Sequence, residues 1–361
     1  DPVTLVMTCV EAGTGGGGGG PSLGNRGIGV VGGWFGGLAH NPDKDEWFVV
    51  SQWIDSSNGT GNAGMQPWAI LLDSAGSPVK TVFHIQKGDI NAWEGKPRVA
   101  YSTKDKKYLV TWYGDTAGKV GTLVGRFYDD AGNPIGSEFD ALSSSGDTVW
   151  DLSTLWYDPV GDVFIQAYEA RPANVGIQAR LARIKGNGQA LPIIDVSKGQ
   201  ALSDYSPRST GKPGVEYCVI SENKPATGPT QLLIRRVNAT SGSVGNTRIF
   251  DINATPMAIA YNSTYDQYLM AYRKGLDTWG VILDPGCNNS IFNPFLIRKD
   301  SWGGFLDYNP NSKTYGLLLG EQNSAANVFI KMSSAGNIMS STVVFPDANT
   351  GLQVIDDSGV D

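Results

Sequence analysis

The sequence is poor in the residue types on which most catalytic and metal sites depend. Its 361 residues include two histidines, His40 and His84, and three cysteines, Cys9, Cys218 and Cys287. No pair of these has the spacing of zinc ligands, so we expect no metal site. A histidine-based triad would have to use one of the two histidines, and we assign no catalytic residue.

Charge and long apolar runs are also scarce. Charged residues are 17% of the chain, and the net charge is −7. An acidic chain argues against nucleic-acid binding, which normally requires a basic face. The apolar stretches are only a few residues long, so no membrane-spanning helix is expected. The chain has no GxxxxGK[ST] loop, and none of its GxG patterns lies between a strand and a helix; we therefore expect neither a nucleotide site nor a cofactor.

Glycine and aromatic residues, by contrast, are plentiful, and most of the chain is an internal repeat. The 47 glycines and 10% aromatic content are typical of short strands joined by tight turns. Six segments reach an aromatic residue nine positions after their first residue, followed by an apolar run; five begin with an apolar residue, and the weakest begins at Arg208. The six aromatic residues are Trp47, Tyr108, Phe164, Tyr217, Tyr268 and Tyr315, of which Tyr217 belongs to the weakest copy.

Most units continue with a third strand, a polar turn containing glycine, and a fourth strand. Residues 122–128, 129–132 and 135–142 form one such series, and residues 327–332, 333–336 and 338–345 form another. Four short antiparallel strands in roughly 50 residues is the pattern of a propeller blade. We predict an all-β fold, a six-bladed β-propeller of four-stranded antiparallel blades over residues 27–345. The units resemble the repeats of secreted bacterial and algal propeller proteins, a resemblance that implies fold and not activity.

An apolar strand is predicted over residues 1–12, ahead of a glycine-rich linker over residues 13–26. The residues that would make its pairing contacts are Val3, Leu5, Val6, Met7, Cys9 and Val10. Such a strand needs a sheet to join. It either completes its own domain or is donated to a neighbouring subunit, and both alternatives stay open. The tail, residues 346–361, contains one more short strand, which closes the ring or lies beside a donated strand.

An aromatic residue stands where the chain enters the first strand in five of the six units, and in four of these an acidic residue lies close to it. The candidate glycan-binding residues are Trp93, Trp150, Tyr205 and Trp302, with Arg98 and Arg208. Aromatic rings stack on sugar faces, carboxylates accept hydrogen bonds from hydroxyls, and arginine binds acidic sugars. The structural alternative is that the rings fill gaps between blades and the arginines pair with acids inside the protein. No pair of acids is assigned to glycoside hydrolysis.

Five N-x-[ST] sequons are candidate glycosylation sites, and all five are expected in exposed loops. They are Asn58, Asn238, Asn253, Asn262 and Asn288. Among the cysteines, Cys218 is expected to be a buried apolar residue, and we predict a disulfide between Cys9 and Cys287, within or between subunits.

These features favour a structural subunit of an extracellular fibre or surface assembly that polymerises head-to-tail through its N-terminal strand. The layout resembles that of glycosylated secreted fibre proteins with an N-terminal donor strand. The start at Asp1-Pro2, without Met, fits a secreted chain whose leader was removed. The expected partners are further copies of the chain and glycans. The alternatives are a lectin-like propeller and a polysaccharide-active hydrolase or lyase.

Overall fold

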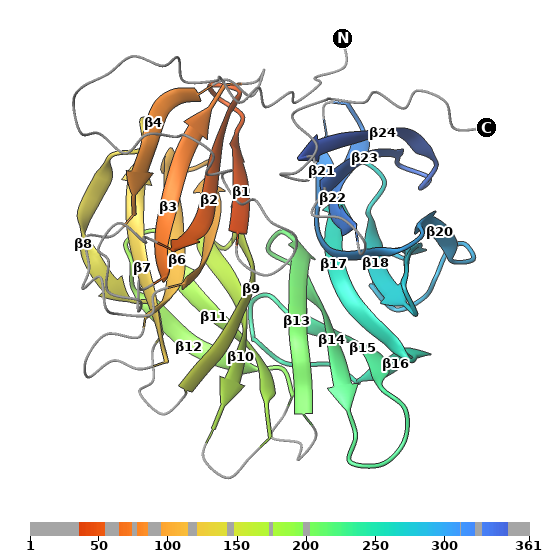
Figure 1. Cartoon of the computed structure of the whole chain (residues 1–361). Coiled ribbons are helices and arrows are strands. Elements are labelled where there is room, and N and C mark those ends of the chain that lie inside the picture. Colours follow the sequence, from red (N-terminus) through yellow and green to blue (C-terminus); the bar gives the residue numbers. More distant parts are fainter. Residues whose placement is uncertain are drawn as a thin grey trace.

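The computed structural model describes residues 36–54, 65–73, 78–85, 95–114, 121–142, 148–172, 176–197, 203–310, 312–321 and 327–345. These residues form six sheets, each of four antiparallel strands, arranged around an axis as the blades of a propeller (Figure 1). The predicted fold is therefore confirmed. The predicted strand over residues 1–12, the linker and the tail lie outside the described residues.

Each blade is built from four consecutive strands. In blades 1 to 3 the strands are β1 (Gly36–Asn41), β2 (Glu46–Ile54), β3 (Met65–Leu72), β4 (Pro78–His84), β5 (Gly95–Ser102), β6 (Lys107–Gly114), β7 (Thr122–Asp129), β8 (Pro134–Asp140), β9 (Thr148–Asp158), β10 (Val163–Arg171), β11 (Gln178–Lys185) and β12 (Ala190–Asp195). In blades 4 to 6 they are β13 (Ser203–Lys212), β14 (Glu216–Lys224), β15 (Gln231–Asn238), β16 (Arg248–Ile252), β17 (Ala254–Asn262), β18 (Gln267–Lys274), β19 (Asp277–Leu283), β20 (Phe295–Arg298), β21 (Ser301–Asn309), β22 (Thr314–Glu321), β23 (Asn327–Ser333) and β24 (Ile338–Phe345).

The strand order within every sheet follows the chain. The first strands of neighbouring blades contact one another around the axis, as β1 does with β5 and β13 with β17. The fourth strand of each blade lies at the outer edge of its sheet, and these edges form the rim of the ring. All six blades thus obtain their four strands from residues 36–345.

The core lies between the blades. Five clusters of buried hydrophobic side chains each join two neighbouring blades, from blades 1 and 2 through to blades 5 and 6. Among the described residues no such cluster joins blade 6 to blade 1. His40 of β1 instead interacts electrostatically with Asp307 of β21 across that junction.

The repeated aromatic residues of the second strands pack against the first strands. Tyr101 and Tyr108 are cross-strand partners, and their ring centroids lie 4.8 Å apart. Blade 4 differs because Gly211 occupies the position facing Tyr217. Trp156 of blade 3 fills the space left by this glycine and contacts Tyr217 edge-on, with centroids 5.2 Å apart. All of the repeated aromatic residues except Trp47 belong to the buried clusters between blades, so these are core positions.

Candidate functional site

A tryptophan and an arginine stack on each other where the chain enters blade 3. The guanidinium carbon of Arg171, the last residue of β10, lies 3.4 Å from the centroid of the Trp150 ring on β9. Trp150 nevertheless remains 48% exposed. A ring stacked on a guanidinium is held in one orientation while part of its surface stays open to a ligand.

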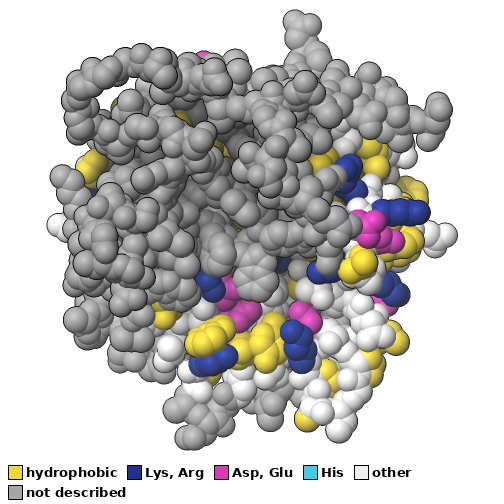
Figure 2. Space-filling model, in the orientation of Figure 1, with side chains coloured by type: hydrophobic (Ala, Val, Ile, Leu, Met, Phe, Trp, Pro, Cys, Tyr) yellow, Lys and Arg dark blue, Asp and Glu magenta, His cyan; other side chains and the backbone are white. Residues whose placement is uncertain are grey.

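Blade 4 repeats this arrangement. Lys224, the last residue of β14, places its amine 4.5 Å from the centroid of the Tyr205 ring on β13. Figure 2 shows hydrophobic, basic and acidic side chains gathered over the inner strands of these two blades. The two rings and their cations form what we call the entry face, defined by Trp150, Arg171, Tyr205 and Lys224.

Two carboxylates lie on neighbouring strands behind this face. Asp151 of β9 and Glu169 of β10 are cross-strand partners. The Asp151 Oδ1 atom lies 2.9 Å from the amine of Lys96, and Glu169 Oε1 accepts a 2.6 Å hydrogen bond from the Ser206 amide. Burial, together with the charge of Asp151, raises the pKa of Glu169 to about 7. The buried carboxyl thus keeps its proton to a higher pH than an exposed glutamate does, while its neighbour faces an ammonium group.

Arg98 ties three blades together. Its guanidinium donates to the main-chain oxygens of Gly36 in blade 1, at 3.0 Å, and of Leu152 in blade 3, at 2.7 Å, and also to that of Ser153. The side chain is buried, and burial lowers its pKa to about 10. The ligand role considered for Arg98 is not favoured, because main-chain carbonyls take up its donors. Asp151 is an acidic neighbour inside the protein, and its charge partly offsets the lowering of the Arg98 pKa.

Arg208, in blade 4, likewise links the two blades on either side of its own. It donates to the main-chain oxygen of Met257 in blade 5 at 2.9 Å and to the hydroxyl of Ser153 in blade 3. Both arginines follow a proline, and the residue before that proline, Lys96 or Ser206, has a positive φ of 56° or 48°. This local bend turns each arginine towards its neighbours around the axis. Together the two side chains link five blades.

The structure brings Trp150 and Tyr205 onto one face and Arg208 behind it. Trp93 lies outside the described residues, and nothing is described of the Trp302 side chain. The sequence analysis missed Arg171, Lys224 and Glu169. The repeat held a signal for the first two, because Arg171 and Lys224 each stand seven positions after the aromatic residue of their unit, Phe164 or Tyr217.

The sequon asparagines differ in exposure. Asn253, between β16 and β17, is exposed, and Asn238, at the end of β15, is also exposed. Asn262 is 0% exposed, and its Oδ1 atom accepts hydrogen bonds from the amides of Thr264 and Tyr265. The expectation that all sequons lie in exposed loops is therefore wrong for Asn262. This asparagine shapes the turn from β17 to β18. Asn58 lies outside the described residues.

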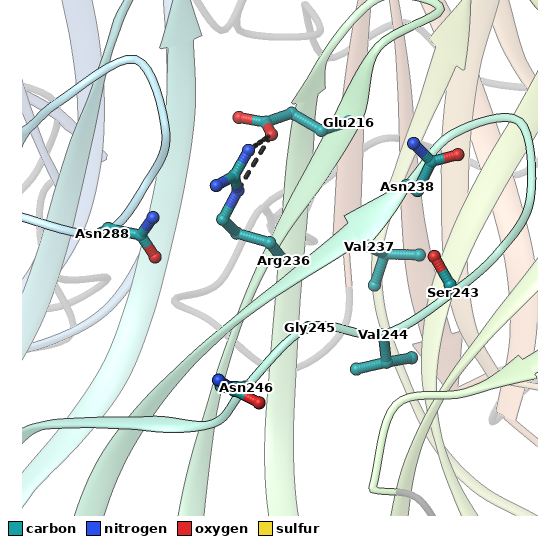
Figure 3. A pocket seen from close by; sticks show the side chains of 9 residues that line it. All are labelled: Glu216, Arg236, Val237, Asn238, Ser243, Val244, Gly245, Asn246 and Asn288. Atoms are coloured by element: carbon teal, nitrogen blue, oxygen red, sulfur yellow. Dashed lines mark hydrogen bonds and ion pairs between the residues drawn. The ribbon is translucent and has the colours of Figure 1, made fainter.

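Asn288 and Asn238 line a single cavity of about 380 Å³ between blades 4 and 5. Figure 3 shows Arg236 pointing towards Glu216, and the Arg236 Nε atom donates to Glu216 Oε2 at 2.9 Å. The remaining lining residues are Val237, Ser243, Val244, Gly245 and Asn246. The two sequons therefore open onto the same small space.

The cysteines are paired differently from our expectation. Cys287, in the turn after β19, forms a disulfide with Cys218 of β14, and their Cα atoms are 6.0 Å apart. The predicted Cys9–Cys287 pair is therefore wrong for Cys287, and Cys218 is not a free thiol. Both residues belong to the cluster of buried side chains between blades 4 and 5, which brings them together. Cys9 lies outside the described residues.

Within the ranges that the structure describes, we find neither a metal-binding group of side chains nor a membrane-spanning helix. No three His, Cys, Asp or Glu side chains there are grouped so as to hold a metal ion. The same ranges contain no helix with the length and apolarity needed to cross a membrane.

No family model matches the chain, and neither does any curated protein. Among solved structures, it resembles a protein of unknown function from Dyadobacter fermentans DSM 18053, with 11% identity, a TM-score of 0.60, and coverage of 85% of this chain and 93% of that one. It also resembles a Hadza microbial sialidase, with 10% identity, a TM-score of 0.55, and coverage of 80% of this chain and 63% of that one. An exo-β-1,3-galactanase from Phanerochaete chrysosporium, solved with galactose, has a TM-score of 0.45 at 10% identity, covering 83% of this chain and 76% of that one. At these identities the similarities establish the propeller fold alone.

Proposed function

We propose that the protein is a structural subunit of an extracellular assembly, polymerising head-to-tail by donating residues 3–10 to a neighbouring propeller. The observation that carries the proposal is that every blade already has four strands from residues 36–345. The apolar strand predicted ahead of the ring is therefore not needed to complete any blade. An apolar strand that is not needed to complete its own blades is suited to extend the sheet of another subunit.

The rim of the ring has properties that suit such an exchange. Outer strands expose large aliphatic side chains, including Val79, Ile135, Ile249, Leu296 and Met339. The edge of a sheet presents unpaired main-chain donors and acceptors to any strand that arrives. The Cys218–Cys287 disulfide is of the kind that persists in oxidising compartments outside the cytosol, which supports an extracellular location.

Negative-stain electron microscopy of the full chain beside a variant lacking residues 1–20 tests the proposal. We expect filaments from the first and separate rings from the second. Leu5→Asp places a charge in the donated strand and should also prevent assembly. Leu23→Asp adds the same charge within the linker and should leave assembly intact. Folded monomers of the full chain at high concentration would overturn the proposal.

A second candidate is glycan binding at the entry face. The observation that favours it is the repetition of a ring stacked against a cation, Trp150 with Arg171 and Tyr205 with Lys224. Such pairs provide flat apolar surface for a sugar ring beside charge for a carboxylate. On a glycan array, Trp150→Ala should lower affinity for any bound glycan about tenfold. Phe292→Ala, at an exposed ring elsewhere, is the matched control. Hydrolysis of a glycan has weaker support. Glu169 is buried and accepts a hydrogen bond from the Ser206 amide, so its carboxyl group is not open to a substrate.

A further inference from the structure

We propose that the outer edge of β24 is the acceptor site, and that residues 3–10 of a second copy pair with it as a fifth strand of blade 6. This inference rests on the proposed assembly and names the surface that the assembly uses. It follows from a comparison of the six outer strands, from the composition of the donated segment, and from the length of chain that joins that segment to the ring.

The outer strands differ in how their edges are protected against pairing. Charged residues and proline discourage the addition of another strand to a sheet edge. Five of the six carry at least one such residue: Pro78 and Lys80 in β4, Pro134, Glu138 and Asp140 in β8, Pro192 and Asp195 in β12, Arg248 and Asp251 in β16, and Arg298 in β20. The β24 segment, Ile338–Phe345, has neither charge nor proline.

Length also distinguishes β24. It has 8 residues, whereas β4 and β8 have 7, β12 has 6, β16 has 5 and β20 has 4. The donated segment, residues 3–10, is equally long and equally free of charge and proline. A longer uninterrupted edge offers more main-chain hydrogen bonds to an incoming strand. The β24 strand and residues 3–10 thus match in number of residues and in their lack of charge and proline.

Within the described residues β24 is the last strand of its sheet, so no described strand pairs with its outer edge. Met339 is 58% exposed, whereas Ile338 packs against the cluster between blades 5 and 6. Blade 6 therefore buries one side of this strand and presents the other to solvent. Residues 11–35 separate the donated strand from β1, and an extended chain of this length reaches about 80 Å. A compact domain of this length is about 50 Å across, so a neighbouring subunit is within range, as is the chain's own blade 6.

Site-specific crosslinking tests this placement. Because Cys218 and Cys287 are paired with each other, Cys9 is the remaining cysteine of the chain. We would introduce Ser340→Cys in β24, and Ser137→Cys in β8 as the matched control, into two differently tagged copies of the full chain. Oxidation of the mixed assembly should link Cys9 of one copy to position 340 of the other. The β8 control should not form this link.

A charge at the same edge provides a second readout. Met339→Lys replaces an exposed side chain, so the ring should fold as before. It should raise the concentration needed for assembly by about tenfold. Ile135→Lys, at an exposed position on β8, should not change that concentration. Circular dichroism of both variants checks that the rings are folded.

The outcomes separate the two proposals. Absence of any oligomer of the unmodified chain overturns the assembly itself. Filaments that form normally with Met339→Lys, or that link Cys9 to β8, overturn the β24 site and leave the assembly standing. A link from Cys9 to position 340 within one chain also overturns the proposal, because the strand then pairs with its own blade.

Discussion

Cys218 and Cys287 join blade 4 to blade 5 across 69 residues of sequence. Both side chains are fully buried, among the hydrophobic residues that the two blades share. A bridge that closes a loop of this length reduces the freedom of the unfolded chain far more than that of the folded one. The covalent bond and the apolar contacts thus stabilise the same junction.

We expect the double variant Cys218→Ala/Cys287→Ala to lower the free energy of unfolding by about 2–4 kcal/mol. Guanidinium denaturation followed by tryptophan fluorescence measures this change. Dithiothreitol should shift the wild-type curve to a similar position, and Cys9→Ser should leave the curve where it is. A wild-type curve that does not respond to full reduction would contradict the assigned pairing.

Glu169 should make stability depend on pH. Burial raises its pKa from an ordinary 4.5 to about 7. Between those values the unfolded chain has released a proton that the folded protein retains, so stability falls as pH rises. We expect this group to account for a decrease of roughly 2–3 kcal/mol in the free energy of unfolding between pH 5 and pH 7.5.

Denaturation curves at several pH values measure the effect of Glu169. Glu169→Gln keeps an oxygen acceptor for the Ser206 amide and removes the titration, so its stability should vary less with pH. Glu138→Gln on the rim is the matched control and should retain the wild-type dependence. Parallel pH profiles for wild type and Glu169→Gln would refute the assignment.

Gly211 is expected to be intolerant of a side chain. A Cβ atom added there would lie 2.6 Å from the Glu216 main-chain oxygen and 2.8 Å from the Trp156 ring. Gly211→Ala should therefore destabilise the protein by about 1–3 kcal/mol. Gly245→Ala, whose added atom would come no closer than 3.5 Å to its neighbours, is the control. Thermal unfolding compares the two, and equal midpoints would show that Trp156 moves aside without cost.

Glycan occupancy should follow exposure. When the chain is secreted from a glycosylating host, we expect glycans at Asn238 and Asn253 in the folded fraction and none at Asn262. Asn262 is fully buried, so a glycan on its side chain would require its turn to open, whereas the exposed Asn238 can carry one without such a change. Glycopeptide mass spectrometry of the folded protein reads all sites at once. A modified Asn262 in folded protein would show that this turn opens.

The propeller could be predicted because its signals are local and repeated. An aromatic residue recurs in each second strand, and a polar turn containing glycine, such as residues 129–132, recurs before the fourth strand of most units. The strands could therefore be placed by comparing the units with one another. The partner of Cys287 could not be predicted, because it depends on which faces of two blades meet. The acceptors of Arg98 could not be predicted either. They are main-chain carbonyls, which every residue has, and only the fold decides which of them face the guanidinium. Asn262 was misjudged because a turn position says nothing about how deeply its side chain is packed.

Within the described residues five junctions of the ring share a cluster of buried hydrophobic side chains, and the sixth, between blades 6 and 1, has none. Joints that bury little apolar surface open at lower free energy than the rest of a fold. Judged on the described residues alone, we expect the junction between the first and last blades to open at lower free energy than the other five. A force that pulls on residue 36 and residue 345, the two ends of the described ring, should therefore separate blade 1 from blade 6 before any other pair of neighbouring blades.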